Sequence, residues 1–270
     1  MPRQTASTPV KVLVVVTYLV MIATNALANA LPINGRTTGE ISDSYQNLFA
    51  PAGLTFSIWG VIYLLLAGHV LYQLGLFHGQ AAARSPAMLQ RVGLLFSASS
   101  LVNAAWIVTW HYDLIGVSVL LLVTLLVLLI LITRLTRRAS LSAREQVLVR
   151  LPFSVYFGWL TVATIANITV WLVSIGWDGF GIPEPTWAVV ILAVGSLIGA
   201  GVILHDRDLA YGLVLVWAYL GIWIKHTGPE GFGGQYPIVS TTALLGIAVV
   251  LIAGAVAALR LRKRTSAVAA

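Results

Sequence analysis

Long apolar stretches, separated by short polar connectors, occupy almost the whole chain. Each is about 20 residues long, enough to cross a bilayer core of roughly 30 Å as an α-helix. The eight stretches cover approximately residues 10–31, 55–76, 92–110, 114–133, 151–175, 186–204, 209–224 and 238–259. The connectors between them carry the turn-forming Gly, Pro and Asn residues. The pattern therefore predicts an all-α integral membrane protein with eight transmembrane helices.

Composition supports this class of protein and limits the kinds of functional site that the chain can form. Charged residues make up 9% of the chain and the mean hydropathy is +0.91, whereas a soluble globular domain carries about a quarter charged residues. The chain has no cysteine, which excludes disulfides, thiolate metal sites and a cysteine nucleophile. A net charge of +7 is compatible with nucleic-acid binding until the basic residues are placed along the chain.

The basic residues follow membrane topology, and we predict no nucleic-acid partner. Cytoplasmic connectors are enriched in Lys and Arg, and alternate connectors here carry 14 of the 16 basic residues. We expect a multi-pass protein of a bacterial cytoplasmic membrane with both termini in the cytoplasm. Only Arg36 and Lys225 fall on the opposite side. The 14 are Arg3, Lys11, Arg84, Arg91, Arg134, Arg137, Arg138, Arg144, Arg150, Arg207, Arg260, Arg262, Lys263 and Arg264.

The first apolar stretch has a second interpretation. Arg3 and Lys11 precede it, and Ala28-Asn29-Ala30 follows as an A-x-A sequence of the kind that signal peptidase cleaves. Cleavage would leave seven spans and move the N-terminus to the outside. We favour retention of this span, because its apolar run exceeds that of a usual signal peptide.

Polar and aromatic residues recur at helical spacing inside four of the spans, and acidic or basic residues do not occupy their centres. The absence of central charges argues against ion-coupled transport. Residues three or four apart share a helix face, so four such faces can converge on a cavity that stacks a flat aromatic ligand on indoles. The alternative, that Asn joins helices and Trp fills space or lies at the interface, stays open. The faces comprise Asn25 and Asn29; Trp59 and Tyr63; Asn103, Trp106 and Trp110; and Trp159, Ala163, Asn167 and Trp171.

Other candidate chemistry is sparse, and we predict no catalytic residue, no metal site and no required cofactor. The five histidines are dispersed, without the spacing of metal ligands, and no Ser or Thr has a base nearby in the sequence. Glu40 and Asp43 are close enough to form an acid–base pair, although a solvated loop is the simpler interpretation. Trp177 and Trp187 lie near span ends, as residues of an interfacial aromatic belt do.

Three motifs resemble those of the translocator protein / tryptophan-rich sensory protein (TspO/MBR) family. The second span contains Trp59-Gly-Val-Ile-Tyr63, similar to the family's W-x-x-[LI]-Y. The third span contains Asn103-Ala-Ala-Trp106, similar to N-x-x-W. The fifth reads Trp159-Leu-Thr-Val-Ala163-Thr-Ile-Ala-Asn167-Ile-Thr-Val-Trp171, which resembles W-x3-A-T-x2-N-x3-W. The ordered set covers roughly residues 10–177.

The resemblance implies a five-helix core at 1–177 that binds porphyrins or other lipophilic molecules between its helices, and commonly a homodimer. Residues 178–270 would then form a three-helix C-terminal extension with a basic tail, outside the five-helix core. Two departures matter: the proline that the family has four residues before the span-five Trp is missing, and Asp178 stands where a basic residue would support sterol recognition. Sterol binding through that segment is therefore not expected.

Three functions from different classes follow. The leading hypothesis is a receptor-like or sensor-like membrane protein that binds a hydrophobic planar ligand of the porphyrin or tetrapyrrole class. The second is a membrane-embedded enzyme acting on an isoprenoid or porphyrin, which would need a proton donor such as Glu40, Asp43 or Asp113. The third is a permease for a lipophilic metabolite. In all three the partners are the lipid bilayer and a lipophilic small molecule.

Overall fold

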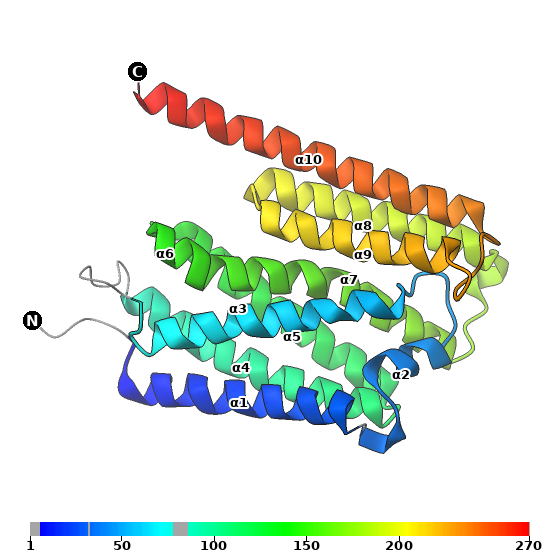
Figure 1. The fold of residues 1–270 in the computed structure, drawn as a ribbon, viewed down its shortest axis with the longest axis horizontal. Helices are drawn as coiled ribbons and strands as arrows, with labels where there is room; N and C mark the ends of the chain where they lie inside the picture. Colours follow the sequence, from blue (N-terminus) through cyan, green and yellow to red (C-terminus); the bar gives the residue numbers. More distant parts are fainter. Residues whose placement is uncertain (1–5, 32, 78–85, 270) are drawn as a thin grey trace, which may run out of the picture. The chain divides into compact units, whose positions relative to one another are not determined.

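A computed structural model describes residues 6–31, 33–77 and 86–269. Two of the basic residues that predict the orientation, Arg3 and Arg84, lie outside these ranges, as do the side chains of Arg262, Lys263 and Arg264. The helices are labelled in Figure 1.

The predicted all-α architecture with eight spans is confirmed: the described residues contain helices and turns, without a strand. Eight helical segments are long and apolar enough to cross a membrane. The seventh, the shortest in the sequence pattern, is a helix of 19 residues. The long helices are α1 (Thr8–Ala30), α3 (Ile58–Gln73, preceded by the 3-10 turn Gly53–Ser57), α4 (Pro86–His111), α5 (Ile115–Arg138), α7 (Leu151–Ser174), α8 (Glu184–Asp206), α9 (Leu209–Thr227) and α10 (Pro237–Ala269).

Short elements connect these helices. The fifth span begins at Ser142, whose side chain accepts from the backbone N–H of Glu145 while the Glu145 carboxylate accepts from the backbone N–H of Ser142. This reciprocal capping box supplies partners for amides at the helix start. A π-helical turn then leads into α7. The short elements are Ile33–Gly35, α2 (Thr38–Ser44), α6 (Ala143–Glu145), the π-helical turn Gln146–Arg150 and Gly179–Gly181.

The chain forms two compact units. The first contains residues up to Ile41 together with Ile58–Leu160, and the second contains Ser42–Ser57 together with Thr161–Ala270. The boundary therefore falls inside α7, and the loop before α3 belongs with the C-terminal helices. The predicted division at residue 177 concerns the extent of the family motifs and not the compactness of the fold, and it stays a prediction.

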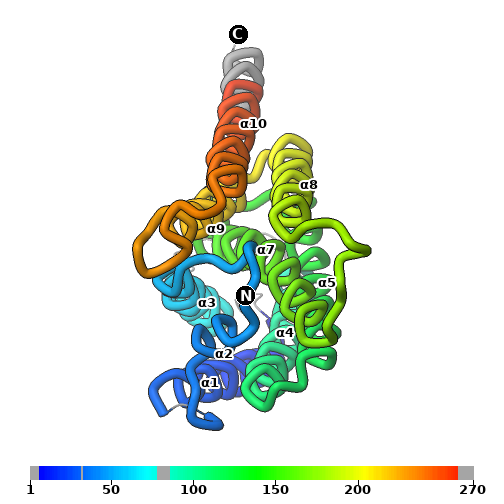
Figure 2. The backbone as a smooth tube through the Cα atoms, turned by 90° about the vertical axis from the view of Figure 1, so that its right-hand side faces the viewer, coloured from blue at the N-terminus to red at the C-terminus, as the bar shows by residue number. Residues whose placement is uncertain are grey.

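In the first unit, α4 packs against both α1 and α5, and α1 also contacts α3; Figures 1 and 2 show α1 and α4 side by side. Three serines lie among the buried residues of α4. The hydroxyls of Ser97, Ser99 and Ser100 are buried and donate to backbone carbonyls of Gly93 and Phe96 in their own helix. Small residues with internally satisfied hydroxyls allow helices to approach closely in a membrane.

In the second unit, α10 packs along α8 and α9. Tyr219 on α9 joins the three helices: it is 1% exposed, and its hydroxyl donates to the Leu192 carbonyl on α8 at 2.8 Å. A Cβ atom placed on Gly246 of α10 would lie 2.4 Å from the Tyr219 ring, and one on Gly195 of α8 would lie 2.5 Å from its hydroxyl. Glycine at these positions therefore lets the three helices pack around a tyrosine.

We expect Gly246→Ala to lower the stability of the second unit by about 1–3 kcal/mol, because overpacking forces a buried ring to move. Gly201→Ala is the matched control: this helical glycine has no atom within 4 Å of an added Cβ. There the better helix propensity of alanine should give a gain of up to about 1 kcal/mol. Thermal unfolding in detergent micelles measures both changes. Equal midpoints for the two variants would contradict the packing described around Tyr219.

Candidate functional site

An aromatic cluster in the first unit brings together side chains from three spans, with Trp59 of α3 at its centre. The Trp59 ring centroid lies 5.5 Å from Tyr63 and 5.7 Å from Trp106 of α4, and both pairs are stacked. Tyr156 and Trp159 of α7 meet the same indole edge-on, at 5.8 and 6.1 Å. Trp106, Tyr156 and Trp159 are buried, whereas Trp59 and Tyr63 are half-buried. Four of the predicted site residues, Trp59, Tyr63, Trp106 and Trp159, therefore lie together within the first unit.

A chain of hydrogen bonds joins α1, α4 and α7 next to these rings. The Asn25 amide of α1 donates to the Asn103 carbonyl oxygen of α4 at 2.7 Å, and also to the Met21 backbone carbonyl at 2.9 Å. The Asn103 amide donates in turn to the Tyr156 hydroxyl of α7 at 2.8 Å. Asn25, Asn103 and Tyr156 are 5%, 0% and 0% exposed. Both asparagines thus make interhelical hydrogen bonds, and a contact of either with a ligand stays a prediction.

Two further predicted site residues hold the connector after α1. The Asn29 side chain donates to the Asn25 carbonyl at 3.0 Å and accepts from the Thr38 backbone N–H at 3.3 Å. The Trp110 indole donates to the Thr38 carbonyl at 3.2 Å, and its ring stacks on Trp106 at 6.2 Å. Asn29 and Trp110 therefore fix the start of α2 over the end of the aromatic cluster.

The last predicted residues, Ala163 and Asn167, lie on the part of α7 that belongs to the second unit. Asn167 is 4% exposed and Ala163 is half-buried. Their place in a ligand pocket stays a prediction. Trp171, at the end of the same sequence stripe, is 37% exposed, so burial along this face ends before that residue.

Sequence spacing missed Tyr156 as a member of the cluster. It lies three residues before Trp159 and therefore on the same helix face, but it belongs to none of the three motifs. The tyrosine adds both a ring and a hydroxyl acceptor for Asn103. A second ring group, in which His69 lies 4.8 Å from Phe153 and 5.4 Å from Phe96, was also not predicted, because its members share no motif.

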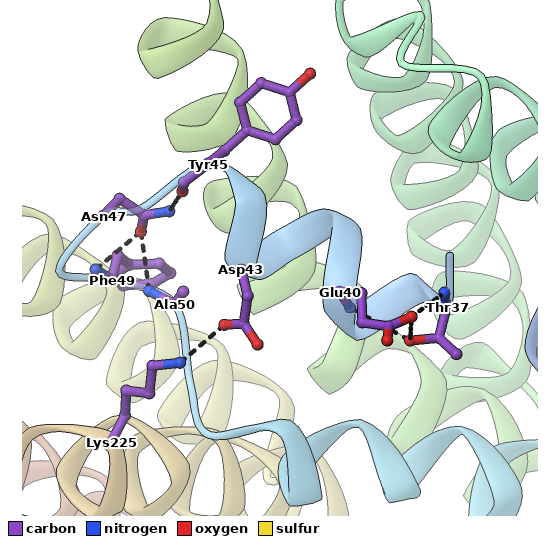
Figure 3. Close-up of polar contacts among 8 residues, drawn as sticks. All are labelled: Thr37, Glu40, Asp43, Tyr45, Asn47, Phe49, Ala50 and Lys225. Atoms are coloured by element: carbon purple, nitrogen blue, oxygen red, sulfur yellow. Dashed lines mark hydrogen bonds and ion pairs between the residues drawn. The ribbon is translucent and has the colours of Figure 1, made fainter. Parts of the chain in front are cut away.

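The three carboxyl groups proposed as proton donors are all engaged as hydrogen-bond or ion-pair acceptors. Glu40 accepts from the Thr37 backbone N–H at 2.6 Å and from the Thr37 hydroxyl at 2.9 Å. These bonds, the backbone one above all, lower the pKa of Glu40. Asp113 pairs with Arg36. In the second unit Asp43 pairs with Lys225 at 2.8 Å (Figure 3).

Among the described residues no group of three His, Asp or Glu side chains is placed to hold a metal ion. What the arrangement offers is a set of indole and phenol rings held by buried amides. Such rings present flat apolar faces, which suit stacking with a conjugated ligand.

Comparison with known proteins identifies the family. The family model described as "TSPO-like protein" matches residues 11–256, so the match continues through the last three spans, beyond the region of the motifs. No curated protein and no solved structure matches the chain. The match covers far more than half of the sequence and includes every residue of the aromatic cluster. The chain belongs to the TSPO-like protein family.

Proposed function

We propose that this membrane protein binds a hydrophobic planar ligand of the porphyrin class at the aromatic cluster around Trp59. Membership in the TSPO-like family makes the chain a membrane sensor or binding protein in general terms. The class of ligand and the location of its site are our proposal. The observation that carries it is the convergence of Trp59, Tyr63, Trp106, Tyr156 and Trp159 within 6.1 Å of the Trp59 centroid.

The burial pattern suggests how a ligand reaches the rings. Trp59 and Tyr63, which are half-buried, lie on α3, while their partners on α4 and α7 are buried. A flat ligand can therefore stack from the α3 side, with Trp106 and Trp159 as a rigid back wall. Stacked and edge-on contacts are both favourable for aromatic rings.

The hydrogen bonds of the two asparagines indicate which residues recognise the ligand and which position the helices. Asn25 uses its amide hydrogens on Met21 and Asn103, and Asn103 donates to Tyr156. We therefore assign ligand recognition to the rings, and to Asn103 the task of holding α1, α4 and α7 in register. This assignment favours apolar stacking over specific polar contacts as the source of affinity.

The carboxyl groups support binding over acid catalysis. A general acid must hold its proton near the working pH, whereas hydrogen bonds lower the pKa of Glu40. Asp43 and Asp113 are each engaged in an ion pair. These contacts count against the membrane-embedded enzyme that uses one of these groups as its proton donor.

Removal of the central ring tests the proposed site. We expect Trp59→Leu to weaken binding of protoporphyrin IX by about 5- to 150-fold, because loss of one stacking partner costs about 1–3 kcal/mol. Trp171→Leu removes an indole that is 37% exposed and outside the cluster, and it should leave the affinity unchanged. The shift of the porphyrin absorption band, titrated in detergent micelles, gives both dissociation constants. Equal affinities for Trp59→Leu and the parent protein would place the porphyrin elsewhere.

We further propose that both termini face the cytoplasm of a bacterial cell. Arg134, Arg137 and Arg138 end α5 at the connector to the fifth span, as expected for a cytoplasmic loop. The two basic residues on the opposite side are both neutralised by ion pairs, Arg36 with Asp113 and Lys225 with Asp43.

The lack of cysteine makes this orientation directly testable with single-cysteine variants. Ser44→Cys, at the exposed end of α2, should react with a membrane-impermeant maleimide in intact cells. Ser140→Cys, in the exposed connector after α5, should react only after the cells are permeabilised. Labelling of Ser140→Cys in intact cells would reverse the topology.

A further inference from the structure

A cavity of about 420 Å³ lies within the second unit, apart from the aromatic cluster. Its walls come from the loop before α3, the end of α7, the turn between α7 and α8, and the first turns of α8. None of the predicted site residues lines it. Its volume falls in the range of about 300–1,000 Å³ that is usual for small-molecule sites. The cavity therefore has room for a small organic molecule.

The loop that forms one wall is held in shape by its own hydrogen bonds. The Asn47 side-chain oxygen accepts from the backbone N–H groups of Phe49 and Ala50, at 3.0 and 2.9 Å (Figure 3). The next contacts tie Leu48 to two helices: its N–H donates to the Glu184 carboxylate at 3.1 Å, and its carbonyl lies 3.0 Å from the His226 ring nitrogen. The wall is therefore preformed.

The charged groups of the lining are all acidic. Asp178 and Glu184 line the cavity, and neither Lys nor Arg does. Asp178 accepts from the Phe180 N–H at 2.9 Å and Glu184 from the Leu48 N–H, but within the described residues neither carboxylate forms an ion pair. Two carboxylates without a protein counter-ion give the cavity a negative potential.

Two indoles stand beside these carboxylates. The ring centroids of Trp177 and Trp187 are 5.2 Å apart, with planes inclined by 55°. The Trp187 N–H donates to the Gly179 carbonyl at 2.8 Å, and a Cβ at Gly179 would lie 2.9 Å from that nitrogen, so the glycine turn fits the indole. The position of both residues at helix ends suits a membrane-interface belt, but they also line the cavity. Inclined indole faces of this kind attract cations.

We propose that this cavity binds an organic cation, with its ammonium group between the indoles and the carboxylates of Asp178 and Glu184. Leu172, Ile182 and Ile191 of the lining then contact its apolar body. An anion would face two carboxylates, and a zwitterionic lipid headgroup would bring a phosphate with no basic residue in the lining to receive it. This site is distinct in chemistry and in place from the porphyrin site proposed above and does not depend on it.

Calorimetric titration of the full chain in maltoside micelles with hexyltrimethylammonium tests the proposal. Saturable binding is expected for the parent protein. Trp177→Leu should weaken it by about 2- to 30-fold through loss of a cation–π contact. Glu184→Gln, which keeps an acceptor for Leu48, should weaken it by about 2- to 5-fold. The matched controls Trp171→Leu and Glu230→Gln alter an indole and an exposed carboxylate outside this lining and should bind like the parent.

Two further titrations serve as controls. One tests whether binding requires the positive charge, and the other tests whether a lipid headgroup can supply the cation. Hexanesulfonate has the same chain with an anionic head and should not bind. Hexylphosphocholine carries the same trimethylammonium next to a phosphate; if it binds as tightly as the cation, the site takes its cation from a lipid headgroup. Equal binding of hexanesulfonate and hexyltrimethylammonium, or equal affinity in all four variants and the parent, would overturn the proposal.

Discussion

A polar side chain buried between membrane helices must find its hydrogen-bond partners in the protein, since hydrocarbon offers none. For three buried side chains of the first unit this constraint is met by a chain of bonds, from Asn25 through Asn103 to Tyr156. The chain crosses α1, α4 and α7, and the aromatic rings around Trp59 stand directly beside it. Tyr156 is itself one of those rings, so the buried amides help to place the cluster.

The second unit uses other means to place its helices. Tyr219 binds a carbonyl of α8 and fits against glycines of α8 and α10, which gives a rigid three-helix packing. The loop before α3 is then attached to this unit through Leu48, which contacts Glu184 and His226. The result is an acidic, indole-lined cavity, whereas the first unit carries a neutral aromatic cluster. The two units thus present surfaces suited to ligands of different charge.

The sequence predicted the eight spans because burial in lipid demands about 20 apolar residues whatever the tertiary contacts. It also predicted that Trp59, Trp106 and Trp159 meet, since helical spacing and family motifs place them on facing stripes. It did not predict Tyr156, which belongs to none of the motifs, nor the cavity beside Trp177. That cavity joins residues 46–49 to residues 169–191, and no local spacing reveals which loop returns to which helix end.

The most direct test of the central claim, that the rings around Trp59 receive a flat conjugated ligand, is a photo-oxidation footprint. Protoporphyrin IX would be bound at substoichiometric amounts, illuminated in air, and the oxidised tryptophans quantified by peptide mass spectrometry. The account predicts that Trp59 and Trp106 are oxidised first, although Trp106 is only 5% exposed, while the more exposed Trp171 is spared. Oxidation that follows exposure instead, with Trp171 modified before Trp106, would contradict it.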